Sequence, residues 1–68
     1  MKIYRYLTGP DDATFCHRVT KALNNGWELH GNPTLTYDVK ESRVICGQSI
    51  VKIVEGEEYN ADLDLARY

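Results

Sequence analysis

The chain has 68 residues, of which 43% are hydrophobic and 26% charged, and its formal net charge at pH 7 is −2. This length allows one domain, and a chain this short buries only about 60% of its unfolded surface. The composition is that of a globular protein and excludes disorder throughout. Domains of this size usually draw added stability from disulfides, a metal or a partner chain.

The charge is unevenly distributed along the chain. Up to residue 54, seven Lys and Arg residues stand against five Asp and Glu residues, whereas residues 55–68 hold five acidic residues and one arginine. Clustered lysine and arginine residues supply the sequence-independent part of nucleic-acid affinity. This balance argues against a nucleic-acid partner. It predicts a compact domain over residues 1–54 and an acidic C-terminal tail over residues 55–68, either a short helix or disordered.

Two cysteines occur in the chain, Cys16 and Cys46, and no apolar run resembles a signal peptide or a membrane span. We therefore expect a cytoplasmic protein with reduced thiols and no membrane association. A Cys16–Cys46 disulfide is the less favoured alternative, because the sequence shows no secretion signal.

The first expected element is a strand over residues 2–7. Tyr4 and Tyr6 share one side of it, and the other side carries Ile3, Arg5 and Leu7. This period-two alternation of β-branched and aromatic residues is typical of a strand. Proline and two aspartates follow, and these residues suit the first turn of a helix.

A helix is expected over residues 11–25. Its apolar side chains recur at helical spacing and form one stripe that faces a sheet, consisting of Phe15, Val19, Ala22 and Leu23. Gly26 can adopt the left-handed conformation that ends a helix. Trp27, the only tryptophan, follows at once. We therefore predict structural roles for Gly26, Trp27 and the apolar stripe.

Two further strands are expected after this joint. Residues 27–30 alternate and then reach Gly31-Asn32-Pro33, where proline cannot donate to a central ladder, so a bulge, a bend or an edge is expected. Extended structure resumes over residues 34–37. After a polar loop, residues 43–54 are apolar on both sides, as in a central strand. The order predicts an α+β fold, strand-helix-strand-strand, with one helix packed on a three- to four-stranded, mostly antiparallel sheet.

One helix covers one face of such a sheet and leaves the other face bare. We assign Tyr4, Tyr6 and Tyr37 to the bare face, as an assembly surface or, second, as a platform for a flat ligand such as a nucleobase. A second copy of the chain in a symmetric dimer is the simplest cover, so we predict a homo-oligomer, a dimer or larger. The alternative cover is the tail, where Tyr59 and Leu63 fall at helical spacing.

Several stretches around the helix and the joint form one pattern. They are Thr8-Gly9-Pro10-Asp11-Asp12, Phe15-Cys16-His17-Arg18-Val19, Gly26-Trp27-Glu28-Leu29 and Val44-Ile45-Cys46-Gly47-Gln48-Ser49-Ile50-Val51-Lys52. Together they resemble a family of short bacterial and phage proteins catalogued as a domain of unknown function. The resemblance spans about residues 1–54 and implies a compact α+β domain. It implies no activity and no catalytic residue.

No arrangement of residues in the sequence indicates catalysis, so we expect no enzyme, no cofactor and no metal. Cys16 and His17 are adjacent on the expected helix and point about 100° apart. With His30 and Cys46 they would form a metal-ligand set whose spacing matches no usual zinc site. Nucleophile elbows, phosphate-binding glycine loops and dinucleotide fingerprints are absent from the sequence.

Two functions stay open. The first is a non-enzymatic, self-associating binding module, a phage-encoded inhibitor that contacts a host protein, by analogy with other stand-alone phage proteins of this size. The second is an oligomer that sequesters a nucleotide-like signalling molecule at subunit interfaces, an anti-defence role. The contact residues expected for a ligand or partner are His17, Arg18 and Lys21 on the helix and Tyr4, Tyr6 and Tyr37 on the strands.

Overall fold

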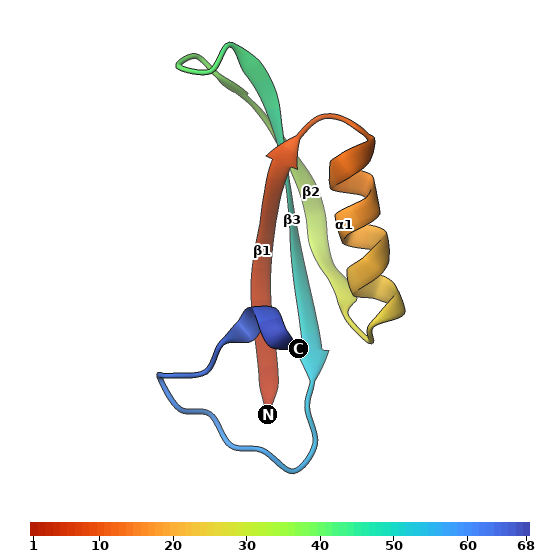
Figure 1. Ribbon diagram of the computed structural model, residues 1–68, viewed down its shortest axis with the longest axis vertical. Coiled ribbons are helices and arrows are strands. Elements are labelled where there is room, and N and C mark those ends of the chain that lie inside the picture. The colour runs from red at the N-terminus through yellow and green to blue at the C-terminus, as the bar shows by residue number, and fades with distance from the viewer.

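The computed structural model describes all 68 residues and contains one sheet, one α-helix and a short 3-10 turn (Figure 1). In chain order the elements are β1 (Lys2–Pro10), α1 (Ala13–Asn24), β2 (Glu28–Asp38), β3 (Arg43–Ile53) and η1 (Leu65–Arg67). The strands are antiparallel and lie in the order β1-β3-β2. The predicted strand-helix-strand-strand α+β fold is confirmed, with three strands and β3 in the centre.

Asp12 caps the start of α1. Its backbone is extended, and its carboxylate accepts hydrogen bonds from the Thr14 hydroxyl and, at 2.9 Å, from the Thr14 main-chain N–H. These two hydrogen bonds hold the pKa of the Asp12 carboxyl below its ordinary value. The bond from the Thr14 hydroxyl makes the larger contribution. The helix therefore begins at Ala13, two residues later than the predicted start.

We expect the advantage of aspartate over asparagine at position 12 to depend on pH. Asparagine also caps helices well, but it has no carboxyl group to titrate. Because folding lowers the pKa of Asp12, its charged form stabilises the fold above the ordinary value of 3.8, and this contribution is lost as the pH falls through the lower folded value. Melting temperatures of the wild type and Asp12→Asn should therefore converge between neutral pH and about pH 2. A difference that stays constant in acid would contradict this reading.

The chain passes from α1 into β2 through a Schellman motif. Gly26 has φ of +91°, which glycine adopts without strain. The main-chain N–H of Trp27 donates to the carbonyl of Ala22 at 3.1 Å, and that of Gly26 donates to the carbonyl of Leu23 at 3.4 Å. The turn directs the indole of Trp27 inward, where it is 3% exposed.

The hydrophobic core is small and consists of four buried side chains, Ile3, Leu7, Trp27 and Ile50. From α1, the partly buried Phe15, Val19 and Ala22 pack against it. Leu23, which the sequence places in the same stripe, is instead 41% exposed. It follows Ala22 directly and therefore points about 100° further round the helix.

The C-terminal segment, residues 55–68, returns to the face of the sheet that α1 covers. Leu65 and Tyr68 pack against the core there. The main-chain carbonyl of Tyr68 accepts hydrogen bonds from Lys52 Nζ at 2.8 Å and from Asn25 Nδ2 at 2.5 Å. The segment thus forms the short turn η1 near β1 and does not cover the opposite face (Figure 1).

A bulge interrupts the pairing of β2 with β3, as the sequence predicts at Gly31-Asn32-Pro33. The register shifts between His30 and Thr34, whereas β3 pairs with β1 without interruption. Beyond the bulge, the β2–β3 hairpin extends past the end of β1 as a separate arm (Figure 1). No helix is long and apolar enough to cross a lipid bilayer.

Candidate functional site

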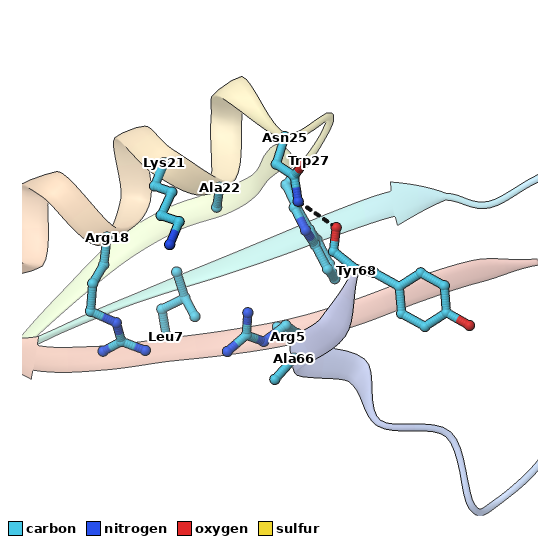
Figure 2. A pocket seen from close by; sticks show the side chains of 9 residues that line it. All are labelled: Arg5, Leu7, Arg18, Lys21, Ala22, Asn25, Trp27, Ala66 and Tyr68. Atoms are coloured by element: carbon cyan, nitrogen blue, oxygen red, sulfur yellow. Dashed lines mark hydrogen bonds between the residues drawn. The ribbon is translucent and has the colours of Figure 1, made fainter.

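A cleft lies on the covered face of the sheet, between α1, β1 and the C-terminal segment (Figure 2). Its volume is about 230 Å³, and nine residues line it. Three of them are cations, Arg5, Arg18 and Lys21, and none carries a carboxylate side chain. The cleft is therefore a basic site in a chain whose formal net charge is −2.

Two elements supply the three cations. Arg18 and Lys21 share one side of α1 because they are three positions apart. Arg5 lies on the covered side of β1, where alternation also places Ile3 and Leu7. Figure 2 shows Lys21 reaching down from the helix toward Leu7, with the guanidinium of Arg5 beside Leu7 over the strand. The three charged ends therefore face a common space.

The cations of the cleft have few partners within the protein. Arg18 donates one hydrogen bond to the main-chain carbonyl of Thr8 at 2.7 Å. The guanidinium of Arg5 lies 6.0 Å from the centroid of the Trp27 ring, and neither Arg5 nor Lys21 makes a side-chain hydrogen bond. The one ion pair of the molecule joins Arg67 to Glu57, outside the cleft. No side-chain carboxylate therefore balances the charge of the cleft.

The structure separates the contact residues that the sequence predicts on the helix. It brings Arg18 and Lys21 together in the cleft, whereas His17 is exposed and does not line it. Sequence reasoning missed Arg5 as a site residue. Its position in the sequence could have indicated this role, because a residue that alternates with Ile3 and Leu7 lies on the core side of the strand.

Tyr4 and Tyr6 lie on the opposite, uncovered face of the sheet. Their side chains are 50% and 48% exposed. The hydroxyl of Tyr4 forms a hydrogen bond with Ser49 Oγ at 3.0 Å, and that of Tyr6 with Thr34 Oγ1 at 2.5 Å. Gly47 leaves room for the end of the Tyr6 ring, since a Cβ at this position would overlap it. Both tyrosines therefore reach sideways to other strands, and their hydroxyls are already bonded.

The prediction that Tyr37 shares this face is wrong. Tyr37 pairs with Val44, and alternation places it on the same side of β2 as Leu35, whereas Thr34 and Thr36 lie on the side of Tyr6. From His30 to Thr34, β2 advances four positions while β3 advances two. The bulge therefore adds an even number of residues and preserves the alternation, which directs Tyr37 away from the other two tyrosines.

The cysteine and histidine residues do not form a reactive or metal-binding cluster. Both Cys16 and Cys46 are free thiols. Loss of solvation, followed by the nearby Asp11, raises the pKa of the Cys46 thiol, which favours its protonated form. No group of three or more His, Cys, Asp and Glu side chains lies close enough to hold a metal ion. The chemistry that the molecule offers is therefore the positive charge of the cleft.

Comparison with known proteins places most of the chain in one family. No curated protein and no solved structure matches the chain. The family described as a domain of unknown function (DUF1737) matches residues 1–53, which end with β3. The C-terminal wall of the cleft, made by Ala66 and Tyr68, lies outside this match. Because the match covers well over half of its 68 residues, the chain belongs to the DUF1737 family.

Proposed function

We propose that the protein is a non-enzymatic binding module that self-associates through the uncovered face of its sheet. The observation that carries the proposal is the exposure of three large hydrophobic side chains on this face, where Tyr4 and Tyr6 are half-exposed and Ile53 is 59% exposed. An exposed apolar surface of this kind marks an interaction site more often than a solvated one. A second copy of the chain would cover it.

The small core supports the same proposal. Only four hydrophobic side chains are buried in the single chain. A domain of this size is marginal alone, and burial of apolar surface against a partner stabilises it by about 25 cal/mol per Å². Association of two uncovered faces would therefore bury more apolar surface and stabilise a fold whose own hydrophobic core is small.

The charges at the rim of the face suit a two-fold arrangement. Lys2 pairs with Ile53 and Glu28 pairs with Val51, so the lysine and the glutamate lie near the same end of the sheet on its two outer strands. A two-fold axis parallel to the strands would place β1 of one copy over β2 of the other. Lys2 would then oppose Glu28 of the second copy, and the same contact would occur twice.

Reversal of these charges tests the arrangement. At tens of micromolar, sedimentation equilibrium should give a multiple of the 7.8 kDa chain mass. Lys2→Glu should raise the dimer dissociation constant about tenfold, because it places like charges together twice. Adding Glu28→Lys should restore the affinity, whereas the control Lys40→Glu, on the hairpin turn, should leave it unchanged. A wild-type mass equal to that of one chain would refute self-association.

A second function, contact with a different protein, is favoured by the arm of the β2–β3 hairpin. Two apolar side chains on it, Tyr37 and Val39, are 58% and 80% exposed, and Leu35, which lies just before the arm, is 67% exposed. This surface is separate from the uncovered face near β1, so a module that self-associates there would still present the arm to a partner. A host-protein inhibitor, expected by analogy with stand-alone phage proteins of this size, would use this arm.

A further inference from the structure

Arg5 is a cation in a position that favours an apolar side chain. It lies between Ile3 and Leu7 on the covered side of β1, and these neighbours are 4% and 3% exposed. Charged groups that are withdrawn from water are normally paired, because desolvation of an unpaired charge is costly. Arg5 is partly buried, has no carboxylate partner and lies over Trp27 at 6.0 Å. Its guanidinium therefore lacks the counter-ion that its surroundings favour.

Arg18 and Lys21 add two further cations with unused hydrogen-bond donors. A guanidinium has five N–H donors, and Arg18 uses one on the carbonyl of Thr8. The ammonium of Lys21 has three donors and no partner in the protein. Three like charges around one hollow repel each other, and a bound anion would replace this repulsion with attraction. An anion between the three cations would therefore interact favourably with each of them.

The other polar groups near the cleft are already engaged. The main-chain oxygen of Tyr68 accepts from both Lys52 and Asn25. The ammonium of Lys52 also donates to the carbonyl of Asn25 at 2.8 Å, and Lys52 is not one of the residues that line the cleft. The free donors that face the hollow therefore belong to Arg5, Arg18 and Lys21.

We propose that this cleft binds the phosphate group of a small phosphorylated compound. Arg5 and Arg18 would supply guanidinium forks that match phosphate oxygens, and Lys21 would supply a point charge. A volume of about 230 Å³ is smaller than the usual pocket for a whole small molecule and leaves room for its phosphate group. A nucleic-acid strand would instead need cations spread along a groove. The site lies on the opposite face of the sheet from the self-association surface, so this proposal stands or falls independently of that function.

Calorimetric titration of the full chain with inorganic phosphate, pyrophosphate and adenosine diphosphate tests the proposal. At least one of these ligands should bind with a dissociation constant of about 10⁻⁴ M or tighter. If adenosine diphosphate binds more tightly than pyrophosphate, the cleft also recognises the organic part of the ligand. If the two bind equally, the cleft recognises the phosphate groups alone. No heat from any of them up to about 1 mM would overturn the proposal.

Matched charge variants locate the binding. Lys21→Gln removes an exposed ammonium that has no partner in the protein, so the fold should be unchanged by circular dichroism. The affinity should fall about tenfold or more, which is the expected loss of one charge-assisted hydrogen bond. Arg5→Gln should reduce it at least as much.

Lys40→Gln removes the same charge from the hairpin turn and should leave the affinity unchanged. Equal losses in Lys21→Gln and Lys40→Gln would show general attraction of anions and would overturn the assignment of the cleft. Tighter binding of a single-stranded oligonucleotide than of pyrophosphate would also overturn it.

Discussion

Replacing Trp27 with alanine is expected to lower the free energy of unfolding by about 3–5 kcal/mol. The indole is 3% exposed and is one of the four side chains that form the core. Its loss leaves a cavity between α1 and the sheet that the remaining three cannot fill. Since a domain of this size lies near the lower end of the usual range of about 5–15 kcal/mol, this loss should remove most of its stability. Urea denaturation followed by far-ultraviolet circular dichroism measures this loss without the tryptophan signal.

Tyr59→Ala is the control for this experiment. Tyr59 is an aromatic residue in the C-terminal segment, and its side chain is 75% exposed. Its removal should change the free energy of unfolding by less than about 0.5 kcal/mol. If Trp27→Ala cost no more than this control, the indole would not anchor the helix to the sheet.

Replacing Gly47 with alanine is expected to destabilise the protein by about 1–3 kcal/mol, as overpacking does, and only while Tyr6 is present. The new Cβ would overlap the hydroxyl end of the Tyr6 ring and Thr34 Oγ1. The ring would have to leave its place over β3, and the hydrogen bond between Tyr6 and Thr34 would break. The cost therefore comes from the tyrosine and not from the backbone of Gly47.

A double-mutant cycle separates these causes. In a Tyr6→Ala background, the Thr34 hydroxyl loses its bond to Tyr6 and can rotate away from the new Cβ. Gly47→Ala should then be neutral or stabilising by about 0.5–1 kcal/mol, because glycine weakens the interior of a strand. Urea denaturation of the four proteins gives the interaction energy between positions 6 and 47. Equal costs of Gly47→Ala in both backgrounds would show that the ring is not what the new methyl group meets.

The elements of the fold were predictable because their signals are local. Alternation defines β1, helical spacing defines α1, and Gly26 with Trp27 defines the turn between them. The positions that the sequence misassigned depend on tertiary arrangement. Whether Leu23 is buried depends on how α1 is rotated over the sheet, and the side on which Tyr37 lies depends on the register of β2 against β3.

The candidate site was only half predictable for a similar reason. Arg18 and Lys21 are three positions apart on one helix, so the sequence alone places them on the same side of it. Arg5 joins them because α1 crosses the sheet beside it, and Tyr68 joins them because the chain returns after β3. Both contacts bring together residues distant in sequence, which composition and periodicity do not report.

The cleft is divided between two parts of the chain, with consequences for how its selectivity can vary. All three cations lie within residues 1–53, whereas Ala66 and Tyr68 belong to the segment that follows. That segment is held by the packing of Leu65 and Tyr68 against the core and by the main-chain oxygen of Tyr68, which accepts from Lys52 and Asn25, whereas Ala66 takes part in neither contact. Different C-terminal sequences could therefore reshape the wall, and with it the choice among anions, while the sheet and its charges stayed the same.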